Sequence, residues 1–302
     1  IKKFLNFNNN LIDFKNHVVD LVYNKNKLII SGSGLFSIND NFEEINYEVI
    51  RENNSYKFKS SINFKTIPII IKSMNYSKKN DDDSLLYLNG IFDKNKEIFF
   101  NKITFSNQKN NFSTKNLKLT SDFKINRFEE IKINFFNDKN IRNEIFIKNS
   151  NNNYDVIGSS YDASTLIDTM LKSSKDNDLF KLFNKLNSTF NIKIDQINLD
   201  QRFNINNLIG KIIVKDNKIK TLNLNSEFST NKKLSFTIFT NNDGEKITTL
   251  FSDYSEPFVK KYKFIKGFEG GVLDFYSIKK NNISNSKLKI YDFKLHEMFS
   301  SN

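Results

Sequence analysis

The chain has 302 residues, with 46 Lys and Arg against 34 Asp and Glu, and it contains neither Cys nor Trp. A content of 38% hydrophobic and 14% aromatic residues excludes intrinsic disorder, and the absence of Cys excludes disulfide scaffolds, Cys-ligated zinc and thiol nucleophiles. The formal charge of +12 would suit binding to nucleic acid or to an anionic membrane surface. However, the abundant Asn, Lys, Ile and Phe all have codons made only of A and T, so a drift of the genome toward A and T explains much of the Lys excess. We therefore expect no nucleic-acid partner.

The N-terminal end shows neither an initiating Met nor a signal peptide, since the chain opens at Ile1. The most apolar run, Ile67-Pro68-Ile69-Ile70-Ile71, has the length of a strand and falls short of the roughly 18 apolar residues of a membrane helix. We therefore expect the chain to be an internal piece of a longer protein.

Alternation of apolar and polar residues dominates the chain, and clusters of Asn, Asp, Gly or Ser interrupt it at intervals of about 8 to 12 residues. Such a period of two places the apolar residues on one face of a strand. The pattern therefore predicts consecutive antiparallel strands. In chain order, the apolar members of the clearest runs are Leu117, Leu119, Phe123 and Ile125; Ile131, Ile133 and Phe135; Leu222, Leu224 and Phe228; and Leu234, Phe236 and Ile238.

Two segments break the alternation and predict short helical insertions, near 162–187 and 256–266. After Asp162 or Ser164 as an N-cap, apolar residues follow at helical spacing, and a second apolar stretch resumes beyond 178. In the second segment Ser255 could cap the helix, Pro257 falls in its first turn, and Gly267 is a natural stop.

The fold class expected from these elements is mainly β: an elongated, curled antiparallel sheet with an apolar concave side and a wet convex side. Such a sheet would form an open hydrophobic groove. The alternative is a closed core built from the 31 Phe residues. The sequence does not separate a dry core from a groove that binds acyl chains, because both require the same residue types.

Residues suited to catalysis or metal binding do not form a motif. Two adjacent acidic pairs, Glu43-Glu44 and Glu129-Glu130, would point to opposite faces of a strand, as hydrated surface charge. The two histidines, His17 and His296, lack HExxH spacing and are expected at the surface or partly packed. Two glycine pairs remain: Gly32-Ser33-Gly34 lacks the rest of a phosphate loop, and Gly270-Gly271 suggests a turn or bulge. We expect no enzyme, no cofactor and no metal site.

Three blocks in the second half resemble a known family. Ile157-Gly158-Ser159-Ser160-Tyr161-Asp162-Ala163 leads into the first predicted helix. Phe251-Ser252-Asp253-Tyr254, the second helix and Gly270-Gly271-Val272-Leu273 follow, and Lys289 to Leu295 closes the series. In order and spacing these blocks resemble the AsmA-like superfamily, in particular its YhdP branch. The match covers about 140 residues, and it departs from the family in the basic residues Lys260, Lys261 and Lys263 and in the absence of an N-terminal membrane helix.

The resemblance implies a bridge-like envelope protein of Gram-negative bacteria, as in YhdP and TamB, whose apolar β-groove carries phospholipids between the inner and outer membranes. It implies that 1–156 form a β-meander of the groove and that 157–302 form a C-terminal-type region continuing the same sheet. The expected partners are phospholipids, and membranes through terminal regions outside this chain; the full-length protein would be periplasmic and anchored in the inner membrane. The alternative is a structural or adhesive β-rich surface protein. The predicted groove-lining residues are Leu117, Leu119, Phe123, Ile131, Ile133, Phe135, Ile192, Ile194, Leu222, Leu224, Phe228, Leu234, Phe236, Ile238, Leu273 and Phe275.

Overall fold

The structure is a computed structural model, and it is mainly β, as the sequence predicts. It divides into two compact units. Unit 1 comprises Ile1–Ser150 and Asp168–Lys185, and unit 2 comprises Asn151–Ile167 and Leu186–Asn302. The residues that the structure describes are 13–38, 41–71, 74–78, 82–93, 97–151, 153–164, 182–200, 202–262, 266–281 and 283–296.

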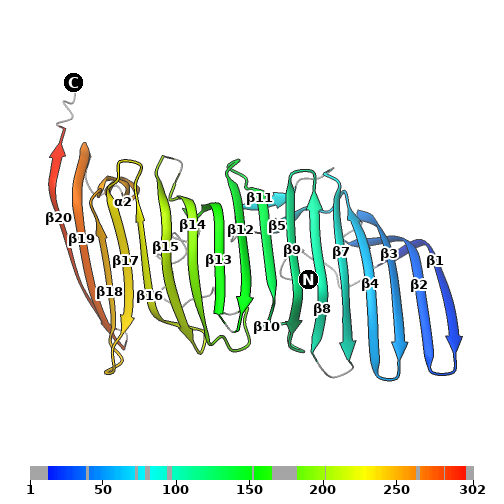
Figure 1. The fold of residues 1–302 in the computed structure, drawn as a ribbon. Helices are drawn as coiled ribbons and strands as arrows, with labels where there is room; N and C mark the ends of the chain where they lie inside the picture. Colours follow the sequence, from blue (N-terminus) through cyan, green and yellow to red (C-terminus); the bar gives the residue numbers. More distant parts are fainter. Residues whose placement is uncertain are drawn as a thin grey trace. The chain divides into compact units, whose positions relative to one another are not determined.

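Unit 1 contains a sheet in which strands that follow one another in the chain lie side by side as antiparallel neighbours (Figure 1). β9 also pairs with the short β10. The strands of this sheet are β1 (Asp13–Asn24), β2 (Lys27–Ile38), β3 (Asn41–Glu52), β4 (Ser55–Phe64), β7 (Ser84–Asp93), β8 (Ile98–Asn107), β9 (Asn110–Leu119), β10 (Ile125–Arg127), β11 (Glu130–Phe136) and β12 (Arg142–Ser150).

A separate small hairpin connects β4 with β7. It consists of β5 (Ile69–Ile71) and β6 (Tyr76–Lys78), which pair antiparallel with each other. Ile67 and Ile69 pack against Phe36 and Phe64 of the sheet, forming the buried cluster of unit 1. We call residues 65–71 and 74–78 the strap. The apolar run from Ile67 to Ile71 is therefore a cover over the sheet rather than one of its strands.

Unit 2 contains a second meander, in which β14 to β20 pair antiparallel in chain order. Its first pair, β13 and β14, is parallel, so the prediction of a purely antiparallel sheet is wrong at this point. Parallel neighbours need a longer connection than a hairpin turn, and residues 163–187 separate these two strands in the chain. The elements are β13 (Asn153–Asp162), β14 (Ser188–Asn198), β15 (Asn204–Lys215), β16 (Lys218–Glu227), β17 (Lys233–Thr240), β18 (Lys246–Ser252), α2 (Glu256–Tyr262), β19 (Phe268–Lys280) and β20 (Ile283–Leu295).

Asparagine has a local role in the turns of both units. Asn53, Asn217 and Asn281 adopt positive φ angles of 54°, 61° and 54° in the turns after β3, β15 and β19. Asn enters this left-handed region at lower cost than most residues. The Asn clusters that predicted turns thus supply the backbone geometry that a tight hairpin needs.

The two predicted helical insertions have different outcomes. Residues 165–181, which hold most of the first insertion, lie outside the described residues. At its C-terminal end the helical interpretation is wrong, because Phe183 forms a parallel β-bridge with Ile125 of β10. In the second insertion the structure describes α2 from Glu256 to Tyr262.

Candidate functional site

One face of the unit 1 sheet is apolar across neighbouring strands; we call it apolar face 1. Its reverse, which we call polar face 1, is mostly polar, but one of its rows consists of Val22, Ile29, Ile50, Ile91 and Phe99, interrupted by Lys57. Cross-strand partners in register point to the same face of a sheet, so the pairings define rows that cross the strands. A central row, which we call row 1, has no buried apolar side chain. It consists of Leu21, Ile30, Val49, Phe58, Gly90, Phe100 and Leu117.

Aromatic side chains contact one another along apolar face 1, one pair edge-on and another tilted. The rings of Phe58 and Phe100 are 5.5 Å apart between centroids at 82°, and those of Tyr56 and Phe92 are 6.2 Å apart. Gly90 lies under Phe58, since a Cβ on Gly90 would stand 2.8 Å from the Phe58 Cζ. The glycine therefore leaves space for a neighbouring ring and keeps the row apolar.

The strap covers one end of apolar face 1 and is held there by a buried carboxylate. Glu43 of β3 is 2% exposed. Its oxygens accept backbone N–H bonds from Lys65 at 2.7 Å, Thr66 at 2.7 Å and Ile67 at 2.6 Å. The ammonium group of the buried Lys78 donates to the Lys65 carbonyl oxygen at 2.9 Å. Because charge-assisted bonds to consecutive amides offset the desolvation of a carboxylate, Glu43 is an anchor for the strap.

Tyr76 places the second strand of the strap against the sheet. Its ring lies 5.2 to 6.4 Å between centroids from the rings of Phe105, Phe112 and Phe135. Burial raises the pKa of the Tyr76 hydroxyl to about 12. The strap thus occupies this end of the face with its own apolar side chains.

Unit 2 has a corresponding apolar face, apolar face 2, with a central row that crosses β13 to β20; we call it row 2. Its apolar side chains are half-buried or exposed, and none is buried. Gly210 lies beneath Leu224, because a Cβ there would stand 2.6 Å from the Leu224 Cδ2. The row consists of Val156, Ile192, Gly210, Leu224, Phe236, Leu250, Phe275 and Leu288.

α2 covers one end of apolar face 2. Val259 of this helix is 0% exposed, and Leu273 of β19 is 4% exposed. The Glu256 carboxylate accepts the Gly270 N–H at 3.1 Å and contacts Lys260. Burial alone would raise the pKa of Glu256, but its hydrogen bonds with Lys260, Gly270 and Tyr254 outweigh burial and lower it. The Ser255 hydroxyl, expected to cap the helix, instead donates to the Gly270 carbonyl at 2.9 Å.

The predicted lining residues of unit 1 fall on apolar face 1 with one exception. Leu117 and Leu119 face Phe100 and Ile98 across the strand pair. Phe123 is wrongly assigned to a strand: it lies between β9 and β10 in a turn with a φ of 60°, and it is 71% exposed. The three remaining residues lie on β11, and Phe135 is fully buried below Tyr76. These β11 residues are Ile131, Ile133 and Phe135.

The predicted lining residues of unit 2 divide between row 2 and buried positions on both sides of it. Leu234 and Leu273 lie toward α2, whereas Leu222 and Ile238 lie on the other side of row 2. Members of row 2 are Ile192, Leu224, Phe236 and Phe275. Buried members of the set are Ile194, Leu222, Phe228, Leu234, Ile238 and Leu273. Phe228 packs edge-on against Tyr254 with centroids 5.3 Å apart.

Sequence reasoning missed the aromatic residues of β4 and β8 and the anchoring role of Glu43. Phe58 sits in an alternating run that could have been found by the same period of two, whereas Phe100 lies beside a register shift that breaks this period. Glu43 and Glu44 do point to opposite faces, as predicted, but Glu43 is buried rather than hydrated. Nothing local in the sequence reveals that the chain returns 22 residues later to cover this carboxylate.

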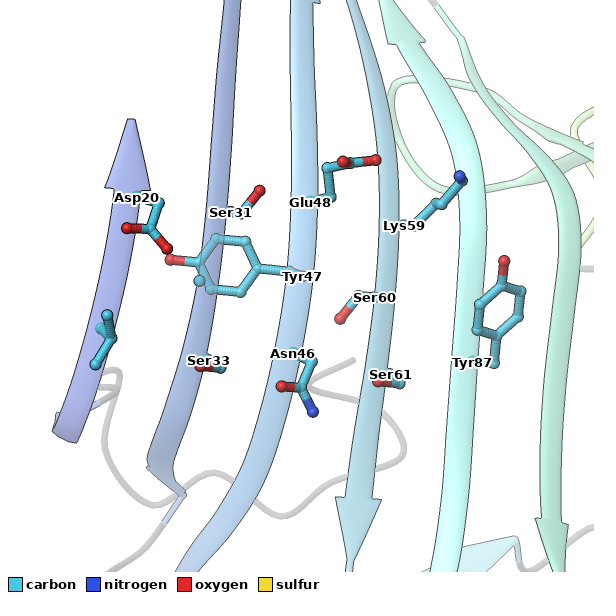
Figure 2. Close-up of a pocket in the computed structure, with 12 residues that line it drawn as sticks. Asp20, Ser31, Ser33, Asn46, Tyr47, Glu48, Lys59, Ser60, Ser61 and Tyr87 are labelled. Carbon is cyan, nitrogen blue, oxygen red and sulfur yellow. The ribbon is translucent and has the colours of Figure 1, made fainter. Parts of the chain in front are cut away.

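A shallow hollow of about 400 Å³ lies in the sheet of unit 1, lined mostly by residues of polar face 1 (Figure 2). Ser31, Ser33 and Ser61 are short side chains among longer ones, including Asp20 and Tyr87, from neighbouring strands. The hollow is open and brings together no nucleophile hydrogen-bonded to a base, which acid–base or covalent catalysis requires. It therefore supports no catalytic assignment.

The two histidines lie apart from any metal-ligating cluster. His17 Nε2 lies 3.2 Å from the Tyr47 hydroxyl, and the largely exposed His296 contacts the Glu269 carboxylate. Among the described residues no group of three or more His, Cys, Asp or Glu side chains could hold a metal ion. In the same part of the chain no helix is long and apolar enough to cross a membrane.

Comparison with known proteins adds no relative. No family model, no curated protein and no solved structure matches the chain. The resemblance to the AsmA-like superfamily therefore stays a prediction.

Proposed function

We propose that the chain is a non-enzymatic lipid-binding segment that shields phospholipid acyl chains on apolar faces 1 and 2. Row 2 carries the proposal: seven apolar side chains and one glycine cross β13 to β20, and none of the apolar side chains is buried. A sheet normally buries its apolar face against another layer. An acyl chain laid on such a face would gain about 0.8 kcal/mol for each CH₂ removed from water.

The proposal extends to the setting that the AsmA-like resemblance implies. In that setting the apolar faces form an open groove for phospholipid transport between inner and outer membranes, in a periplasmic protein anchored in the inner membrane through other regions of its chain. Movement along a row of similar apolar side chains needs no catalytic residue and no cofactor.

A structural or adhesive β-rich protein with a closed Phe core is the second candidate. The ring cluster of the buried Tyr76 and Phe135 with the half-buried Phe112 favours it locally. The half-buried Phe58, Phe100 and Phe236 favour lipid binding, because a closed core would exclude water from these rings.

The experiment is native mass spectrometry of the purified chain, followed by lipid extraction and identification. Co-purifying phospholipid that is lost in Phe236→Asp and Leu224→Asp, but kept in the control Thr237→Asp, would support the proposal. Thr237 lies on the same strand with its side chain on the opposite face. A lipid-free, monodisperse and stable protein would contradict lipid binding and favour the structural alternative.

A further inference from the structure

We infer that apolar face 1 binds an anionic phospholipid in one orientation, with its phosphate at Arg51 and its acyl chain running along β3 toward the strap. This inference rests on the proposed lipid-binding function. The first observation is the distribution of charge on apolar face 1. The strand register places one acidic side chain, Glu43, and one basic side chain, Arg51, on this face along the described strands β1–β4, β7–β9, β11 and β12.

Among the described residues, Arg51 has an aromatic neighbour and no carboxylate partner. Its cross-strand partners are Leu28 and Tyr56, and its guanidinium carbon lies 6.0 Å from the Tyr56 ring centroid. Within the described part of the chain no carboxylate is paired with Arg51. The neighbouring Glu52 points to the other face, where its carboxylate lies 3.7 Å from Lys27 and 3.2 Å from Lys57.

Glu43 shows the opposite arrangement at the other end of the same strand and face. Its charge is satisfied by the three consecutive amides of the strap. Eight residues of extended strand separate Glu43 from Arg51, or about 26 Å. The face-1 side chains between them are Ile45, Tyr47 and Val49. β3 therefore presents an apolar strip that is closed at one end and ends in a free cation at the other.

Unit 2 does not repeat this order along β19. Glu256 accepts the Gly270 N–H at the end covered by α2, but toward Lys279 the face is buried as well, at Ser277, Ile238 and Leu222. The inferred orientation therefore applies to apolar face 1.

The ligand class follows from the guanidinium and its setting. Arg binds phosphate through two parallel N–H bonds, and stacking on a ring orients its plane. Because Arg51 is the cation that register places on apolar face 1 along these described strands, and no described carboxylate is paired with it, a headgroup without a cation of its own is preferred. Phosphatidylglycerol has such a headgroup, whereas the choline of phosphatidylcholine adds a repelled positive charge.

The test measures headgroup preference with the whole chain. The protein is incubated with mixed vesicles of phosphatidylglycerol and phosphatidylcholine, and the bound lipids are identified by native mass spectrometry. Wild type and the control Lys57→Gln, which removes a charge of the same hairpin from polar face 1, should prefer phosphatidylglycerol. In Arg51→Gln the ratio of bound phosphatidylglycerol to phosphatidylcholine should fall about tenfold, which corresponds to the loss of one charge-assisted hydrogen bond. Thermal unfolding verifies that each variant is folded.

Each outcome decides the inference separately from the proposed function. Lipid bound without preference, or an equal loss in Arg51→Gln and Lys57→Gln, would overturn the Arg51 site while leaving lipid binding intact. A third outcome would also overturn it: inorganic phosphate binds wild type but not Arg51→Gln, while neither protein prefers one phospholipid over the other. Absence of any bound lipid would overturn both claims.

Discussion

The ring of Tyr47 lies across Gly32 on the neighbouring strand. A Cβ on Gly32 would stand 2.4 Å from the Tyr47 Cζ and 2.5 Å from its hydroxyl oxygen, and that hydroxyl lies 3.2 Å from His17 Nε2. The same relationship joins Gly90 to Phe58 and Gly210 to Leu224. Glycines inside these strands therefore leave space for large side chains of the neighbouring strand on the apolar face.

Gly32→Ala tests this relationship. We expect a loss of about 1 to 3 kcal/mol in the free energy of unfolding, since the added methyl group forces the Tyr47 ring out of place. Chemical denaturation measures it. Ser31→Ala, on the opposite face of β2, is the control and should change stability little. In the double variant Gly32→Ala with Tyr47→Ala the two effects should not add, and strict additivity would contradict the contact.

Glu43→Gln should release the strap. The amide group cannot accept from all three backbone N–H donors, and an unsatisfied buried donor costs about 1 to 3 kcal/mol. Hydrogen exchange should accelerate at the amides of Lys65, Thr66 and Ile67, which donate to Glu43. The exposed neighbour Glu44 provides the control variant Glu44→Gln. Unchanged protection of the three amides in Glu43→Gln would show that the strap is held by packing alone.

Alkaline pH should weaken the strap through Tyr76. Burial raises the pKa of its hydroxyl from 10.0 to about 12 in the folded protein. Its contribution is therefore fully present below about pH 10 and is lost as pH rises toward 12. Unfolding free energies of wild type and Tyr76→Phe, measured from neutral to alkaline pH, should converge or cross in this window. Parallel curves would contradict a buried hydroxyl.

Acidic pH should loosen the cover of apolar face 2 through Glu256. Although burial opposes it, hydrogen bonding holds the folded pKa of Glu256 below the ordinary value of 4.5. Its stabilising contribution is present above that value and is lost as pH falls through the lower folded pKa. The protection factor of the Gly270 amide, which donates to Glu256, should fall in that range, relative to the intrinsic exchange rate at each pH. In Glu256→Ala, which removes the acceptor, the Gly270 amide should exchange rapidly already at neutral pH.

The sequence predicted the local part of this fold well. Leu224 and Phe236 lie opposite each other on one face, because strict alternation sets the face of each strand. Relations between distant segments could not be predicted in this way. Phe123 fits the period of two, yet it lies in a turn closed by the hydrogen bond from the Phe123 N–H to the Thr120 carbonyl. The parallel pairing of β13 with β14 and the burial of Glu43 depend on where the chain returns, which periodicity does not encode.

The central claim is that acyl chains bind to the apolar faces. Photo-crosslinking from the two faces of one strand tests it most directly. A photoreactive phenylalanine analogue is placed at Phe236, on apolar face 2, or at Thr237, whose hydroxyl lies 2.6 Å from that of Thr249 on the reverse face. After expression in cells, mass spectrometry identifies the adducts. Lipid adducts at position 236 that are absent at 237 are the predicted result. Equal labelling at both positions, or no lipid adduct at 236 in folded protein, would contradict the lipid-binding face.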